Sequence, residues 1–299
     1  MCGIVGLYLK NPQWHSQLGR LFGPMLEEMS ARGPDSAGFA FYHDEAPGIE
    51  KVTVYDADTC RDWQALAGEA SRALSTPVTA TKVSTHALLR AESPPGTLRG
   101  WLERTHPDTR ITSSGHTIEI FKEVGLPHDV LAEFGARERT GTHAIGHTRM
   151  ATESAVTTEG AHPFNTGADL CLVHNGSLSN HHRLRRRLAK SAGLVFQTDN
   201  DSEVAAGYLT WRLNEGATIE EALEAALVDL DGFYTFAVGT ADGFSVLRDP
   251  IACKPAVLAE TDDWVAMASE FRALATLPGV DAATVWEPEP ATVYSWRGA

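Results

Sequence analysis

A cysteine stands at position 2 of this 299-residue sequence, in the segment MCGIVG. A methionine before a residue as small as Cys2 is usually removed, which would leave a thiol and a free α-amine on one residue. The pKa values of these two groups, about 7.7–8.0 for the amine and about 8.5 for the thiol, are closely matched. Cys2 could therefore act as a nucleophile with its own general base, and Gly3 would leave the neighbouring backbone open to a substrate carbonyl. The alternative is an unused thiol at a poorly ordered chain end.

An Asn-Gly pair, Asn175-Gly176, follows the apolar run LCLVH. The side-chain amide of Asn175 and a backbone N–H at Gly176 can point the same way, as the donors of an oxyanion hole do. The alternative is an ordinary hairpin turn, which Asn-Gly strongly favours.

Two charged residues are candidates for holding the ends of an amino acid. Arg149 ends the predicted buried strand in GHTRMAT, where its guanidinium would bind a carboxylate, either of a ligand or of an internal ion pair. Asp201, in TDNDSEV, begins a predicted helix, where it is either an ammonium acceptor or the N-cap. Taken together with Cys2 and Asn175, these residues describe a pocket for an α-amino acid that carries a side-chain amide.

The elements that must position these residues follow from hydrophobic spacing. Residues 3–9 form a continuous apolar run that predicts a buried strand directly after Cys2. Apolar residues from Leu18 to Met29 recur at helical spacing. The apolar runs in AIGHTRM and LCLVHN predict two more buried strands. Four further helices are predicted: one at 63–74, one that begins at His181 and is capped by Asn180, one that begins at Asp201 and ends at Gly216, and one that begins with a Thr218–Glu221 capping box.

The segment 56–138 is less regular but rich in apolar residues, so we expect an ordered insertion. Before it, FAFYH and KVTVYD resemble the two strands of a hairpin. Inside it, PPGTLRGWLERTHPDTR has the composition of a loop. Antiparallel-looking runs of strands separated by helices predict a layered α+β fold, with two sheets and helices outside them.

Composition limits the possible functions. The net charge of −14 disfavours binding to nucleic acid or anionic membranes. The four cysteines and twelve histidines match no metal-binding spacing, so we expect no metal and no cofactor. No signal peptide or apolar run long enough for a membrane span is found. Free thiols are typical of a reducing compartment, and we expect a cytoplasmic protein.

The order of motifs along the chain resembles that of one enzyme family. MCGIVG, RGPDSAG, GHTRMAT, AHPF, HNG and TDNDSEV occur in the order found in class II glutamine amidotransferases, the N-terminal-nucleophile glutaminases. This resemblance implies the four-layer αββα sandwich of N-terminal-nucleophile hydrolases. It also implies that residues 2–299 form one amidotransferase domain, with an insertion at approximately 56–138.

The resemblance assigns roles to the residues that match the family motifs. It implies that Cys2 is the nucleophile, that Asn175 and Gly176 form the oxyanion hole, that Arg149 and Thr152 bind the glutamine α-carboxylate, that Asp201 accepts the α-ammonium, and that Arg32 supports the nucleophile. Met150 and Glu153 depart from residues found in other members of the family, at the loop that closes over the substrate.

The resemblance also implies a reaction and partners. Cys2 would form a γ-glutamyl thioester with L-glutamine, releasing ammonia and then glutamate. Because no synthase domain follows the glutaminase motifs, we expect a free-standing subunit. It is similar to the amidotransferase subunit of glutamate-synthase-like and N-methylglutamate synthase complexes, with a flavin and iron–sulfur synthase subunit and a β-helix subunit as partners. The alternatives are a stand-alone γ-glutamyl amide hydrolase and a non-catalytic glutamine-sensing regulatory subunit.

Overall fold

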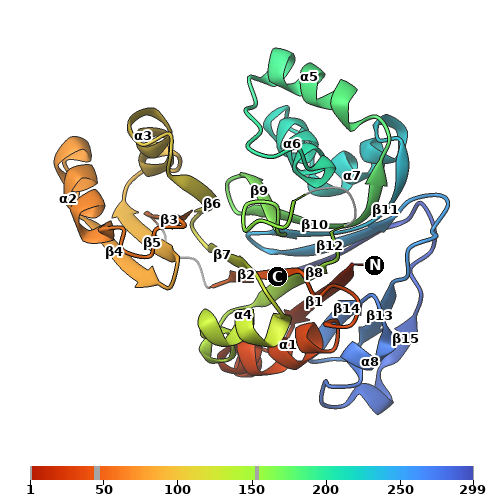
Figure 1. Cartoon of the computed structure of the whole chain (residues 1–299). Helices are drawn as coiled ribbons and strands as arrows, with labels where there is room; N and C mark the ends of the chain where they lie inside the picture. Colours follow the sequence, from red (N-terminus) through yellow and green to blue (C-terminus); the bar gives the residue numbers. More distant parts are fainter. Residues whose placement is uncertain (1, 44–47, 152–154, 299) are drawn as a thin grey trace.

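Two antiparallel sheets facing each other form the centre of the computed structural model, which describes residues 2–43, 48–151 and 155–298 (Figure 1). The seven-stranded sheet has the order β15-β13-β14-β1-β8-β2-β7, and the five-stranded sheet has the order β16-β12-β11-β10-β9. The strands of the first sheet are β1 (Gly3–Leu9), β2 (Ser36–Tyr42), β7 (Ile118–Val124), β8 (His143–Arg149), β13 (Val257–Glu260), β14 (Trp264–Ala268) and β15 (Thr284–Trp286). Those of the second are β9 (Phe164–Gly167), β10 (Leu170–Leu178), β11 (Gly232–Thr240), β12 (Gly243–Arg248) and β16 (Val293–Arg297).

Strand β1 shows why its sequence is apolar at almost every position. Val5, Leu7 and Leu9 point to the helices that cover the outer face of the seven-stranded sheet. Ile4 and Tyr8 point the other way, into the apolar layer between the two sheets. Because successive side chains of a strand alternate between faces, a strand buried on both faces needs apolar residues throughout. The predicted strand at 3–9 is confirmed.

Helices cover the outer face of each sheet. The seven-stranded sheet is covered by α1 (Leu18–Glu27), α4 (Pro127–Glu133) and α8 (Phe271–Leu274). The five-stranded sheet is covered by α5 (His181–Ala192), α6 (Asp201–Asn214) and α7 (Ile219–Asp229). Short 3-10 segments span Pro12–Gln17, Ala136–Glu138 and Val280–Ala282. The layers are therefore helix, sheet, sheet, helix, and the predicted αββα sandwich is confirmed (Figure 1).

A third, four-stranded sheet stands beside the sandwich (Figure 1). It has the order β4-β5-β3-β6 and carries its own apolar core with two helices. Its elements are β3 (Ile49–Tyr55), α2 (Trp63–Leu74), β4 (Val78–Val83), β5 (His86–Glu92), α3 (Thr97–Thr105) and β6 (Arg110–Gly115). The segment 56–138 is ordered, as expected. Strand β7, which follows β6 in the chain, belongs to the seven-stranded sheet.

Several local predictions are confirmed, and others are wrong. The helix at 63–74 and the Thr218–Glu221 capping box are present. The predicted hairpin between FAFYH and KVTVYD is absent, because β2 pairs with β7 and β8 whereas β3 pairs with β5 and β6. The predicted loop around 97–105 is the helix α3.

The predicted cap of α5 is only half right. Asn180 occupies the N-cap position, but its side chain forms no capping hydrogen bond to the helix. Its amide instead donates to the carbonyl of Asp229, and its side-chain oxygen accepts from the N–H of Asp231. Asn180 therefore joins the start of α5 to the end of α7 and the residues that follow it. No helix in the described part of the chain is long and apolar enough to cross a membrane.

Candidate active site

Cys2 lies directly before β1, at the edge where β1 meets β8. Gly3 pairs with Thr148 in the antiparallel ladder, so Cys2 is next to the end of β8. Its Sγ lies 3.9 Å from the carbonyl oxygen of Met150, within range of a weak S–H···O hydrogen bond. The residue is half-buried. The ladder thus fixes the backbone while the thiol keeps access to solvent.

Gly3, which was expected to leave the backbone next to Cys2 open to a substrate, also has a packing role. A Cβ at Gly3 would lie 2.7 Å from the Cβ of Met29 and 2.8 Å from Oγ1 of Thr148. Both distances are shorter than contacts that side chains tolerate. Only glycine lets the first residue of β1 fit against these two side chains.

Arg32 holds the backbone of Cys2 through one hydrogen bond. Its Nε donates to the carbonyl oxygen of Cys2 at 2.9 Å, and its Nη1 donates to Oε1 of Glu270 at 2.7 Å. The hydrogen bond from Arg32, together with the positive charges of Arg272 and Arg32, lowers the pKa of Glu270 against the opposing effect of burial. Arg32 thus connects the start of β1 to the residue before α8. Glu270 was not predicted from the sequence, because nothing local marks it.

The rest of the RGPDS segment supports the end of β8. The N–H of Asp35 donates to the carbonyl of Arg149 at 3.1 Å, and its Oδ2 accepts from the N–H of Ala151 at 2.8 Å. A Cβ on Gly33 would lie 2.3 Å from the carbonyl carbon of Thr148. The segment therefore packs directly on the backbone that leads to Arg149.

Asn175 and Gly176 lie inside β10, not in a turn, so the alternative of a hairpin turn is wrong. They pair with Thr235 and Tyr234 of β11. The side-chain amide of Asn175 is buried and donates to the carbonyl oxygen of Cys2, with Nδ2 3.2 Å from that oxygen. A Cβ on Gly176 would lie 2.0 Å from the carbonyl oxygen of Phe233. The structure therefore brings the Asn-Gly pair and Cys2 together from different sheets.

Arg149 is the last residue of β8 and is buried. Its Nη1 donates to the carbonyl oxygen of Ala155 at 3.2 Å. A Cβ on Gly160 would lie 3.4 Å from the same Nη1, so the guanidinium extends along the loop that follows β8. Thr152 and Glu153, which the sequence analysis placed beside it, lie outside the described residues.

Asp201 is the first residue of α6, and the N-cap is its neighbour Asn200, whose side chain accepts from the N–H of Ser202. The alternative that Asp201 is the N-cap is therefore wrong. Oδ2 of Asp201 accepts from the N–H of Leu178 in β10 at 2.8 Å, and Oδ1 lies 3.8 Å from Nδ1 of His174. These contacts place the carboxylate beside the strand that carries Asn175.

Three buried histidines lie behind this strand, and sequence reasoning did not assign them to the site. His147 and His162 stack with ring centroids 4.0 Å apart, and Nε2 of His147 donates to the carbonyl oxygen of His174 at 3.1 Å. Burial lowers the pKa of His147 to about 3 and that of His162 well below its usual value. Nδ1 of His174 lies 2.9 Å from Oγ of Ser202. The neutral rings thus pack β8, β10 and α6 together. In the described part of the chain, no group of three potential ligands is arranged to hold a metal ion.

Known proteins similar to this chain decide its family. The family model of the glutamine amidotransferase domain matches residues 147–276. A glutamine amidotransferase-like protein GlxB from Rhizobium meliloti (strain 1021) is 54% identical over 297 residues, which cover 99% of this chain and 98% of that protein. A putative glutamine amidotransferase from Methanothermobacter thermautotrophicus is 33% identical over 284 residues, which cover 90% of this chain and 92% of that protein. The chain belongs to the class II glutamine amidotransferases.

The fold of this amidotransferase is also found in a solved structure. Glutamine phosphoribosylpyrophosphate amidotransferase from B. subtilis, complexed with ADP and GMP, superposes with a TM-score of 0.62 at 21% identity. The match covers 99% of this chain and 49% of that one, so this amidotransferase spans about half the length of that protein. At this identity the match shows the common fold of N-terminal-nucleophile amidotransferases.

Proposed function

We propose that this amidotransferase hydrolyses L-glutamine to L-glutamate and ammonia, with Cys2 as the nucleophile after removal of Met1. The observation that carries the proposal is the meeting of Cys2 and Asn175 from two different sheets, with the amide nitrogen 3.2 Å from the Cys2 carbonyl oxygen. An asparagine amide has two N–H donors, so one N–H can hold the backbone of Cys2 while the other faces a substrate. Arg32 fixes the same carbonyl from another direction.

The reaction would begin with attack of the Cys2 sulfur on the side-chain amide carbon of glutamine. The α-amine of Cys2 takes the thiol proton, and the carbonyl oxygen becomes an oxyanion stabilised by Asn175 and an N–H at Gly176. As the C–N bond breaks, the α-ammonium donates this proton to the leaving nitrogen, and ammonia departs. Water then attacks the γ-glutamyl thioester and gives its proton back through the α-amine, which releases glutamate and the free thiol.

The other end of glutamine would be bound by charge. Arg149 would bind the α-carboxylate, with Thr152 beside it, and Asp201 would accept the α-ammonium. Support comes from the position of Arg149 at the end of the strand that pairs with the start of β1. The Asp201 carboxylate keeps a fifth of its side-chain surface exposed (20%) while Leu178 holds it in place. A bidentate guanidinium–carboxylate contact would orient the amide toward Cys2.

The proposal includes the destination of the ammonia. The resemblance to glutamate-synthase-like complexes favours transfer to a separate synthase subunit that carries a flavin and an iron–sulfur cluster, together with a β-helix subunit. It treats residues 2–299 as one amidotransferase domain with an insertion at approximately 56–138. The protein would act in the cytoplasm and would need no cofactor of its own.

The experiment is intact-mass analysis after treatment with a glutamine-like diazoketone, on the wild-type chain and on Cys2→Ala. We expect wild-type protein without Met1 that gains one adduct, protection by L-glutamine, and no adduct on Cys2→Ala. A glutaminase assay in parallel should lose activity in the same variant. Cys171→Ala is the matched control, because this thiol is buried between the sheets and should leave labelling unchanged.

Other outcomes separate the alternatives. Glutamine binding with no adduct and no turnover would contradict the proposal and favour a glutamine-sensing subunit. Hydrolysis of larger γ-glutamyl amides in preference to glutamine would favour a stand-alone amide hydrolase.

A further inference from the structure

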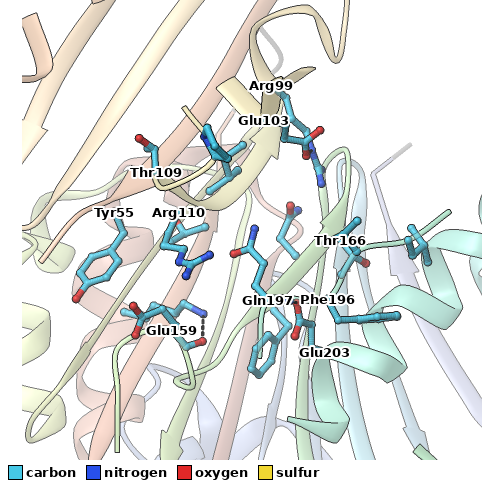
Figure 2. Close-up of a pocket in the computed structure, with 18 of the residues that line it drawn as sticks. Tyr55, Arg99, Glu103, Thr109, Arg110, Glu159, Thr166, Phe196, Gln197 and Glu203 are labelled. Atoms are coloured by element: carbon cyan, nitrogen blue, oxygen red, sulfur yellow. Dashed lines mark hydrogen bonds and ion pairs between the residues drawn. The ribbon is translucent and has the colours of Figure 1, made fainter. Parts of the chain in front are cut away.

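A cavity of about 570 Å³ lies between the four-stranded sheet and the sandwich (Figure 2). Its walls come from β3 and β6 of the four-stranded sheet and from α3 on one side. On the other side they come from β7, from β9 and the loop before it, and from α6 and the loop before it. None of the residues proposed to bind or cleave glutamine is among the described residues that line it. Its volume is within the range of pockets that hold small metabolites.

Most charged groups in this cavity are already hydrogen-bonded to the protein. Arg99 pairs with Glu103 at 2.8 Å, and Lys122 donates to the carbonyl oxygens of Glu159 and Ala161 at 3.0 and 2.8 Å. Glu203 accepts from the N–H groups of Gln197 and Thr198. These groups build the walls and have little capacity left for a ligand.

Two side chains of opposite charge differ from the rest. Within the described residues, neither the exposed guanidinium of Arg110 nor the half-buried carboxylate of Glu159 has a hydrogen bond or an ion pair. The positive charge of Lys122 lies close enough to Glu159 to interact with it electrostatically. Arg110 begins β6, whereas Glu159 lies in the loop before β9, so each comes from a different wall. Burial raises the pKa of Tyr55 against a hydrogen bond with Thr158 that lowers it, and the negative charges of Glu123 and Glu159 add to the rise.

The remaining lining groups suit a ligand with an organic side chain. Tyr55 and Phe196 supply aromatic rings, and the amide of Gln197 adds a hydrogen-bonding group (Figure 2). A simple anion at Arg110 would be repelled by Glu159, and a simple cation at Glu159 would be repelled by Arg110. A molecule that carries both charges satisfies both residues.

We propose that this cavity binds a free amino acid or a similar small zwitterion. Arg110 binds its carboxylate, Glu159 binds its ammonium group, and the side chain lies toward Phe196. The site lies beside the proposed glutamine site but shares none of its described residues, and it does not depend on the proposed glutaminase activity.

The test is isothermal titration of the full-length protein with each common L-amino acid, repeated on Arg110→Gln and Glu159→Gln. We expect at least one amino acid to bind, with affinity weakened about tenfold or more in each variant, since each loses a charged hydrogen-bonding partner. Arg104→Gln is the matched control, because this exposed arginine of α3 does not line the cavity. Acetate and methylammonium, which carry one charge each, should not bind.

Several results would overturn the proposal. One is the absence of binding by every amino acid at millimolar concentration. Another is binding that neither variant weakens, which would place the ligand elsewhere, for example in the glutamine site. A third is binding of acetate that strengthens in Glu159→Gln, which would identify a simple anion site. Because the readout is heat of binding, a negative result for glutaminase activity leaves this test intact.

Discussion

The side-chain amide of Asn175 and the carbonyl oxygen of Cys2 are joined by a hydrogen bond that crosses from one sheet to the other, 3.2 Å from Nδ2 to oxygen. Cys2 precedes a strand of the seven-stranded sheet, and Asn175 lies in the five-stranded sheet. Ile4 and Val173, fully buried neighbours of these two residues, belong to the apolar cluster between the sheets. The packing of the two sheets against each other therefore sets the distance between Cys2 and Asn175.

Replacing Asn175 tests this relationship. In Asn175→Ala we expect the kcat for glutamine hydrolysis to fall about 10²–10³-fold, the usual effect of losing one oxyanion donor. KM should change much less, because the contact strengthens as charge develops in the transition state. Steady-state kinetics with ammonia detection provides the measurement. Asn11→Ala, which removes the side-chain cap of a distant 3-10 segment, is the control and should keep the wild-type kcat. Equal losses in both variants would contradict the assignment.

The parts of the fold that sequence reasoning predicted correctly are those with local causes. The continuous apolar run at 3–9 identifies a strand buried on both faces, and Thr218 with Glu221 identifies a helix start. Strand pairing failed at β2 and β3, because the partners of β2 come from residues about a hundred positions further along the chain. The candidate site residues were found through their motifs, since no local pattern places Asn175 against Cys2.

Helix α3 was missed for a specific physical reason. Its N-cap is Gly96, which offers no side chain to the free N–H groups of the first turn. The buried carboxylate of Glu50 accepts from the N–H groups of Gly96, Leu98 and Arg99 at 3.0, 2.8 and 3.2 Å. The cap therefore comes from a strand 46 residues away from the N-cap, and no local pattern reveals it.

Gly33 should be essential for the packing of the RGPDS segment. A Cβ there would lie 2.3–2.5 Å from backbone atoms of Thr148 and Arg149, which cannot move without disturbing β8. We expect Gly33→Ala to lower the free energy of unfolding by about 1–3 kcal/mol. Gly68→Ala is the matched control: it lies inside α2 with no neighbour closer than 3.6 Å, and should raise stability by up to about 1 kcal/mol. Urea denaturation measures both, and equal effects would contradict the packing argument.

Buried histidines should make the protein sensitive to mild acid. Burial lowers the pKa of His86, His143 and His147 to about 3, whereas in the unfolded chain the value is near 6.5. Between these values the unfolded state binds more protons, so the free energy of unfolding falls as pH decreases from about 6.5 toward 3. The slope is at most about 1.4 kcal/mol per pH unit for each histidine, falls to about half of that near pH 6.5, and vanishes above about pH 8.

A variant isolates one of these contributions. His143 donates from Nε2 to the carbonyl of Thr240 at 3.0 Å and stacks on Tyr42. His143→Gln should remove up to about 1.4 kcal/mol per pH unit from the slope measured by denaturation between about pH 7 and pH 5. His182→Gln, an exposed residue of α5, should leave the slope unchanged. The slope is informative even if the variant is less stable at every pH, and an unchanged slope in His143→Gln would refute the prediction.

The buried carboxylate of Glu119 should be the strongest electrostatic link between the four-stranded sheet and the sandwich. Arg139, Arg90 and Lys51 lie 2.7, 3.3 and 3.5 Å from its oxygens, and His43 lies at 3.4 Å. Burial alone would raise the pKa of Glu119, but the hydrogen bond from His43 and the positive charges of His43, Lys51 and Arg139 lower it to about 2, so the group stays ionised at neutral pH.

Glu119→Gln would leave the surrounding cations without their counter-charge, and we expect a loss of about 3–5 kcal/mol in the free energy of unfolding. Glu27→Gln is the matched control, because the Glu27–Arg137 pair has good geometry, 2.8 Å, but is exposed to solvent. Its loss should be below about 1 kcal/mol. Thermal and urea denaturation compare the two variants. If both lose the same amount, the Glu119 cluster contributes no more to stability than a surface pair.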